Sequence, residues 1–148
     1  MRLDRAHGAT DAAPAVLVLA VDETASRTAR GAVRVFLAHA GTPAACVDDA
    51  VLVMAELLAN GHTACRGVTP VVVEAAAGPG LVVIQVTNDR LPGTPDELVL
   101  PPVRMPLPDE HRGRGLPLVA LLCARLAFVH GRATTMVRAE LLWERALV

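Results

Sequence analysis

Hydrophobic positions in the first third of the chain form two patterns, a continuous apolar run and then apolar residues at helical spacing. The apolar run within residues 13–22 is typical of a β-strand. From Asp22, which we expect to be an N-cap, apolar residues recur at helical spacing until Gly41. This part of the chain therefore predicts one strand followed by one amphipathic helix.

A second, longer helix is predicted for residues 42–67. Thr42 would be its N-cap and Pro43 its first helical residue, and Gly67 would end it. Two stripes run along this helix. The apolar stripe consists of Val47, Val51, Met54 and Leu58, and the mixed stripe consists of Asp49, Val53, Glu56 and Asn60. Polar groups thus share one helix face with apolar side chains.

The middle of the chain predicts a β-hairpin and then a long loop. Residues 68–76 and 81–88 are rich in β-branched side chains, and the Gly-Pro-Gly sequence between them favours a tight turn. The pattern then ends, and residues 89–114 contain six prolines. A loop of this length inside a domain is usually a functional cover or a disordered segment.

Regular periodicity resumes after the long loop. A helix is predicted from Leu116, with Pro117 tolerated in its first turn, and residues 126–131 and 133–143 predict a closing pair of strands. The order of strands and helices predicts the α/β class, as an α+β two-layer sandwich with a mixed sheet and helices on one face. We expect a tail over residues 1–14 and one domain over residues 15–148.

Composition limits the function classes that the chain can belong to. The chain has 148 residues, a hydrophobic share of 53% and only 2% aromatics, so one aliphatic core is expected. A formal net charge of -1 and a pI near 6.5 argue against direct nucleic-acid binding and against an anionic membrane as partner. With no apolar run long enough to span a bilayer and no signal-peptide pattern, we expect a cytoplasmic protein.

Missing residue types exclude several chemistries. All 14 basic residues are Arg, which excludes a Walker-type phosphate loop and a Schiff-base lysine. The only serine is Ser26, which excludes a serine-hydrolase nucleophile elbow. The three cysteines are far apart and favour reduced, buried thiols over disulfides. His62 and Cys65 lack a second ligand pair for a metal, so we expect them to be packing residues.

Glu56 and Asn60 are the first candidate site residues, because they lie four residues apart on one predicted helix. The amide oxygen of Asn60 could bind a hydrated magnesium ion beside phosphates, and Glu56 could polarise a water or hydroxyl. The alternative is an exposed, solvated pair on the helix surface.

The sequence RGRGLPLV, residues 112–119, is the second candidate. The first N–H groups of a helix that begins near Leu116 have no partner within the helix, so they could bind phosphate. Gly113 and Gly115 would let the chain approach closely, and Arg112 and Arg114 would add charged contacts. A simple joint between loop and helix is the alternative.

The third candidate is the end of a predicted strand at Asn88 and Asp89. A polar side chain there could recognise the amino group of a purine, and an ordinary Asx turn is the alternative. Strand alternation places Asn88 on the same face as the apolar Ile84 and Val86, and Asp89 on the other face.

The order and spacing of these three motifs resemble the GHKL (histidine-kinase-like) ATPase superfamily, and within it the bacterial anti-sigma-factor serine kinases. LVMAELLANGHTA resembles the Glu-x-x-x-Asn helix of that family, VVIQVTNDRLPG its adenine-binding strand end, and HRGRGLPLV its Gly-x-Gly-Leu box. The resemblance covers residues 16–142, nearly the whole chain.

The resemblance implies a Bergerat-type ATP-binding fold with ATP and Mg²⁺ between helix and sheet, under a mobile lid formed by residues 89–114. It implies that Asn60 binds magnesium and that Glu56 is the catalytic base. It implies further nucleotide contacts from the strand ends and the glycine-rich box: Asn88, Asp89, Gly93, Arg112, Gly113, Arg114, Gly115, Leu116 and Thr135. The partners it implies are a sigma factor and a STAS-type anti-anti-sigma protein.

The sequence departs from the family pattern at the strand end. The family usually has Asp where this chain has Asn88, and Arg90 and Leu91 replace glycines, leaving only Gly93. Two functions therefore stay open, a serine/threonine kinase that regulates a sigma factor and an ATP-binding or nucleotide-free interaction module of the same fold. The sequence also leaves open whether the chain forms a homodimer.

Overall fold

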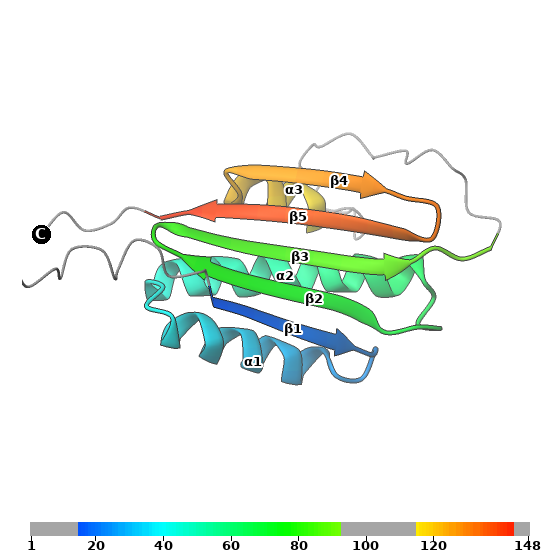
Figure 1. The fold of residues 1–148 in the computed structure, drawn as a ribbon, viewed down its shortest axis with the longest axis horizontal. Helices are drawn as coiled ribbons and strands as arrows, with labels where there is room; N and C mark the ends of the chain where they lie inside the picture. Colours follow the sequence, from blue (N-terminus) through cyan, green and yellow to red (C-terminus); the bar gives the residue numbers. More distant parts are fainter. Residues whose placement is uncertain (1–14, 93–114, 144–148) are drawn as a thin grey trace, which may run out of the picture.

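The computed structural model describes residues 15–92 and 115–143, which form one five-stranded sheet and three helices (Figure 1). The strands are β1 Ala15–Val21, β2 Val71–Gly78, β3 Leu81–Asp89, β4 Arg125–His130 and β5 Thr134–Leu142. The helices are α1 Ser26–His39, α2 Ala44–Ala64 and α3 Gly115–Leu122. The predicted tail and most of the predicted lid lie outside the described residues.

The strands lie in the order β1-β2-β3-β5-β4, and every described pair is antiparallel. The expected α+β sandwich is confirmed, but the expectation of a mixed sheet is wrong. Two helices separate β1 from β2, so the chain crosses the sheet once along α1 and returns along α2. β2 therefore starts at the end of the sheet where β1 finishes, and the two strands pair in opposite directions.

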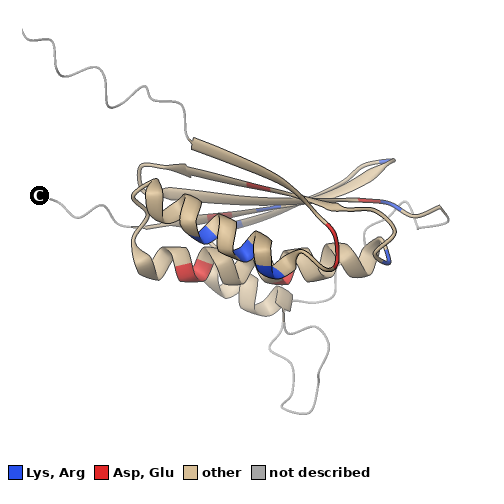
Figure 2. Cartoon of the chain, turned by 90° about the horizontal axis from the view of Figure 1, so that it is seen from below, with Lys and Arg blue, Asp and Glu red and all other residues tan. Residues whose placement is uncertain are grey.

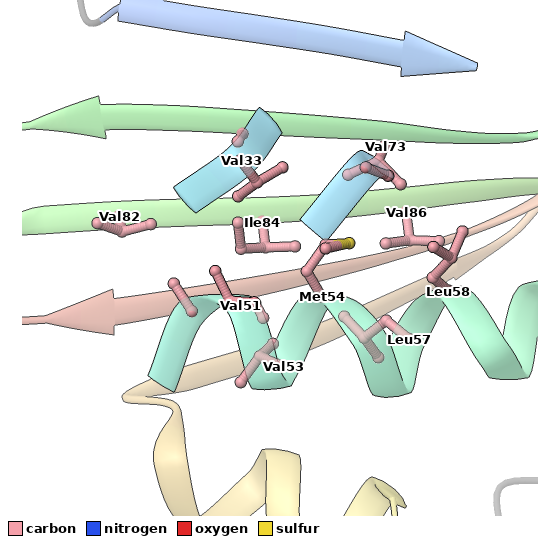
Figure 3. Packing of buried hydrophobic residues seen from close by; sticks show 14 of the residues in the cluster. Val33, Val51, Val53, Met54, Leu57, Leu58, Val73, Val82, Ile84 and Val86 are labelled. Atoms are coloured by element: carbon pink, nitrogen blue, oxygen red, sulfur yellow. The ribbon is translucent and has the colours of Figure 1, made fainter. Parts of the chain in front are cut away.

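The helices cover one face of the sheet, as the alternation of burial along the strands requires (Figure 2). Aliphatic side chains from both layers fill the space between them, and Met54 and Leu57 of α2 pack among them (Figure 3). No described helix covers the opposite face, where Val16 and Val18 are more than half exposed. Among the described helices, none is both long enough and apolar enough to cross a membrane.

The start of α1 differs from the expected N-cap at Asp22. The carboxylate of Asp22 accepts hydrogen bonds from the backbone N–H and the hydroxyl of Thr24, at 2.9 and 2.7 Å. These bonds close a turn before the helix, which begins four residues later at Ser26. The hydrogen bond from the Thr24 hydroxyl is also the main reason that the pKa of Asp22 lies below its usual value.

The start of α2 is also displaced, by one residue. Pro43 has an extended ψ of 146° and is the N-cap, so Ala44 is the first helical residue. Thr42 lies one residue before the N-cap, and its backbone N–H donates to the carbonyl of Leu37 in α1, at 3.1 Å. The helix ends at Ala64, three residues before the expected Gly67, which has a φ of +65°.

Both predicted hairpins are confirmed. Gly78 pairs with Leu81, which leaves a two-residue turn in which Gly80 has a φ of +74°. The second hairpin joins β4 to β5, and the N–H of Gly131 donates to the carbonyl of Thr134 across the turn at 2.9 Å.

The three cysteines are free thiols, as expected. Cys46 and Cys65 are buried, and Cys123 is half-buried. Burial raises the pKa of Cys46, with a smaller contribution from Asp49, and raises the pKa of Cys123 to about 11. The thiols of Cys46 and Cys123 are therefore protonated and poorly nucleophilic at neutral pH.

Candidate functional site

Helix α2 carries Glu56 and Asn60 one turn apart, so both side chains leave the helix on the same side. Glu56 is half-buried and Asn60 is exposed. The carboxylate and the amide oxygen are the two hard oxygen donors that the sequence predicts for a magnesium site. Their position between the core face of α2 and solvent leaves both groups able to bind a ligand.

Gly61, the residue after Asn60, lets α2 approach the sheet. A Cβ atom added at this position would lie 3.0 Å from Cγ1 of Val71 and 3.6 Å from Cγ1 of Val86. These two valines belong to β2 and β3, the central strands beneath the helix. A larger residue at position 61 would push the helix, and Asn60 with it, away from the sheet.

Gly115, the first residue of α3, lies directly against Glu56. A Cβ atom added at Gly115 would overlap Oε2 of Glu56 and would lie 3.3 Å from its Cδ atom. The first turn of α3, whose N–H groups have no partner within the helix, therefore begins next to the Glu56 carboxylate. We call Glu56, Asn60, Gly61 and Gly115 the helix contact.

Asn88 occupies the end of β3 on the face that the helices cover. It is only 7% exposed, and its Nδ2 atom donates to the backbone carbonyl of Asp89 at 3.1 Å. Asp89 points the other way and is exposed, as strand alternation predicted. The amide therefore replaces the expected acid at the buried strand-end position.

Thr135 lies directly opposite Asn88 in the β3–β5 ladder, and His130 lies opposite Thr135 in the β4–β5 ladder. Residues paired in this way share one face of the sheet. Nδ1 of His130 lies 2.8 Å from Oγ1 of Thr135. We call Asn88, Thr135 and His130 the strand-end row.

Arg90 forms hydrogen bonds with the turn between β4 and β5, next to the strand-end row. Its backbone N–H donates to the carbonyl of Ala133 at 2.8 Å, and its guanidinium donates to the carbonyl of Gly131 at 2.6 Å. These bonds tie the end of β3 to the turn between β4 and β5. Arg90, which replaces a glycine of the family pattern, therefore has a structural role in this chain.

Two observations on the described residues are consistent with a binding site for a nucleotide and Mg²⁺. Glu56 and Asn60 supply a carboxylate and an amide oxygen as metal ligands, and the start of α3 has a glycine where an added Cβ atom would displace the end of Glu56. Leu116 is half-buried beside this glycine. Gly93, Arg112, Gly113 and Arg114 lie outside the described residues.

Three residues of the site were missed by sequence reasoning. Gly61 could have been noticed as a glycine inside a strong helical pattern, which often marks a close packing contact. His130 was missed although the predicted hairpin of residues 126–143 already places it near Thr135, because the sequence does not show that β3, which carries Asn88, pairs with β5. The role of Arg90 depends on the same long-range pairing. His62 and Cys65 are buried as expected, and within the described residues no His, Cys, Asp or Glu cluster could hold a metal ion.

These features define the class of protein, an α+β sandwich with a polar site at one end of its central helix and strands. The family model for the histidine kinase-like ATPase domain matches residues 17–141. The chain therefore belongs to the histidine kinase-like ATPase domain family.

Comparison with solved structures supports the same fold. The chain is similar to the crystal structure of the RsbU and RsbW domains of Rv1364c from Mycobacterium tuberculosis, with a TM-score of 0.60 and 22% sequence identity. The match covers 86% of this chain and 32% of that chain, so this protein spans about a third of its length. A search of the curated proteins finds no match.

Proposed function

We propose that this protein is an ATP-binding regulator that phosphorylates a partner protein on serine or threonine and binds a sigma factor. The observation that carries this proposal is the contact between Glu56 and Gly115, beside Asn60. Three useful groups lie near this contact. The carboxylate of Glu56 can accept a proton, the amide oxygen of Asn60 can bind Mg²⁺, and the start of α3 can bind phosphate. Family membership supports the nucleotide, because the family typically binds ATP with Mg²⁺.

Bound ATP would supply the phosphoryl group, and the chain would supply position and charge. Phosphoryl transfer needs little more than alignment and neutralisation of charge. The amide oxygen of Asn60 would bind the magnesium ion, and the N–H groups at the start of α3 would bind phosphate oxygens. Glu56 would accept the proton of the attacking serine hydroxyl.

Helix α1 offers a surface for a protein partner. Its buried residues Ala29 and Val33 face the core, and Arg27 and Arg30 are exposed on the other side, where Figure 2 shows a row of basic residues. Such a row suits a partner with acidic side chains. The structural neighbour contains an RsbW domain, which supports a sigma factor and a STAS-type antagonist as the partners proposed here.

A second function is favoured by one observation at the strand end. Asn88 carries no charge, so its amide oxygen is a weaker acceptor for the amino group of adenine than the carboxylate of the family pattern. Weaker adenine binding would leave an interaction module that keeps the fold and transfers no phosphate. The two functions differ in whether nucleotide binds and whether a partner becomes phosphorylated.

Titration with a fluorescent ATP analogue, with and without Mg²⁺, tests the proposal. We expect saturable binding with a Kd of about 1 mM or tighter, in the range that enzymes commonly show for their substrates. Mg²⁺ should strengthen binding to the wild type and have little effect on Asn60→Ala. Thr63→Ala, an exposed position on the same helix, should behave as the wild type. Absence of binding at millimolar nucleotide would contradict the proposal.

A further inference from the structure

The strand-end row contains a side chain to which the family resemblance gives no role. His130 is the last residue of β4, and it is half-buried on the same face as Asn88 and Thr135. Its Nδ1 atom is within hydrogen-bond distance of Thr135 Oγ1, at 2.8 Å. One of these two atoms must therefore donate a proton to the other.

The orientation of the Asn88 amide can be assigned from its partner. The carbonyl of Asp89 can only accept, so the atom bonded to it is the NH₂ group of Asn88. The side-chain oxygen of Asn88 accepts no hydrogen bond from another described residue and is available to a ligand. At this end of the sheet the protein therefore presents a hydrogen-bond acceptor.

An acceptor of this kind matches the amino group of adenine, and the next atom along the adenine edge, N1, is itself an acceptor. A site that binds both atoms needs a donor beside the Asn88 oxygen. Thr135, the neighbour of Asn88, has one hydroxyl proton and can donate it only once. If Thr135 donates to His130, it has no proton left for the base.

We propose that His130 is a positioning residue for nucleotide binding, because its Nδ1–H donates to Thr135 and leaves the Thr135 hydroxyl free to donate to adenine N1. This inference rests on the proposed function, since it concerns the base end of the same ATP site. His130 contacts no part of the base in this account. It sets the direction of one proton on a neighbour that does.

The proposal predicts a preference between two nucleotides. ATP presents an amino group and an acceptor at N1, whereas inosine triphosphate presents a carbonyl oxygen and an N1–H donor. The pattern of donors and acceptors is reversed, so wild-type protein should bind ATP more tightly than inosine triphosphate. That preference should depend on His130.

Four variants test the dependence, with competition by ATP and by inosine triphosphate against the fluorescent analogue. His130→Ala should weaken ATP binding roughly fivefold, the usual net effect of one hydrogen bond, and leave inosine triphosphate binding unchanged or tighter. Thr135→Val should give the same loss, and the double variant should lose no more than Thr135→Val alone. His130→Asn should restore the preference, because its amide can place an N–H donor near the position of Nδ1.

The ring nitrogens of His130 provide a readout that does not depend on a folded alanine variant. In a ¹⁵N spectrum of the wild type with a bound ATP analogue, Nδ1 should carry the proton, and its signal is assigned by its loss in His130→Asn. An unprotonated Nδ1 would overturn the inference, as would equal losses for both nucleotides in His130→Ala. Wild-type protein that binds no ATP would overturn the proposed function itself, which distinguishes the two failures.

Discussion

The two halves of the candidate site are built in different ways. In the helix contact, glycines at positions 61 and 115 let backbone segments approach a neighbour so closely that a side chain would not fit without movement. In the strand-end row, polar side chains lie next to one another on three adjacent strands, and the side chains of Thr135 and His130 are within hydrogen-bond distance. The helix contact depends on the absence of side-chain volume at its glycines, and the strand-end row depends on which groups donate and which accept hydrogen bonds.

This difference sets how each region responds to substitution. Added volume should damage the helix contact in two ways: at Gly61 it meets close-packed valines that can yield only a little, and at Gly115 it displaces the end of the Glu56 side chain. The strand-end row should tolerate changes of volume better than changes of donor to acceptor, because a buried polar group without a partner is costly.

The largest effect is expected at Glu56. Glu56→Gln keeps the size of the side chain but cannot accept a proton, so phosphoryl transfer to a partner should fall by about 10²–10⁴-fold. Nucleotide affinity should change little, and Asp49→Asn, two turns earlier on α2, should leave transfer unchanged. Transfer rates from ³²P-labelled ATP provide the measurement. Equal transfer rates in Glu56→Gln and the wild type would show that Glu56 is not the catalytic base.

A large loss of stability is expected at Gly61. Gly61→Leu would force a side chain into Val71 and Val86, and we expect it to lower the free energy of unfolding by about 2 kcal/mol. Gly31 is the matched control, because no atom lies within 4 Å of an added Cβ atom there. Gly31→Leu should raise stability by about 0.5–1 kcal/mol through helix propensity. Denaturant unfolding that shows no difference between the two variants would contradict the close approach of α2 to the sheet.

An intermediate effect on activity, with little effect on stability, is expected at Gly115. Gly115→Ala would displace the end of the Glu56 side chain, which can rotate away at low cost. We expect transfer to fall about tenfold, equivalent to about 1.4 kcal/mol, while thermal unfolding stays near the wild-type temperature. Gly31→Ala controls for the added methyl group. Unchanged transfer in Gly115→Ala would show that the position of the Glu56 carboxylate does not matter.

The smallest effect is expected at Asn88, where the change is only from donor to acceptor. Asn88→Asp would put a carboxylate against the carbonyl of Asp89, and we expect a loss of stability of about 1 kcal/mol at pH 8. Burial should raise the pKa of the new carboxyl in the folded state, so the protonated form is favoured by folding. The loss should therefore be smaller at pH 5 and grow as pH rises through that pKa.

The neighbouring residue supplies the control for this prediction. Asp89 is exposed on the other face of β3, so Asp89→Asn should change stability by less than about 0.5 kcal/mol at either pH. Chemical unfolding at the two pH values measures both variants. A variant Asn88→Asp that is as stable as the wild type at pH 8 would show that the donor to Asp89 is not needed.

Sequence patterns predicted the elements and the inward position of Asn88, because period and alternation are local properties. They placed both helix starts wrongly: the Asp22 carboxylate accepts from Thr24 in a turn before α1, and Pro43 rather than Thr42 is the N-cap of α2. The antiparallel sheet and the approach of Glu56 to Gly115 depend on segments far apart in the chain. The place of His130 in one row with Asn88 also depends on a long-range pairing, that of β3 with β5, whereas its contact with Thr135 lies within the predicted β4–β5 hairpin.

The central claim is that one nucleotide contacts both regions of the site. Backbone amide shifts measured during titration with a non-hydrolysable ATP analogue and Mg²⁺ test it most directly. We predict large, saturable shifts at Gly61, Gly115 and Thr135 with a single Kd, and small shifts on the open sheet face, for example at Val18. Shifts confined to one region, or two regions that saturate with different Kd values, would contradict a single ATP site.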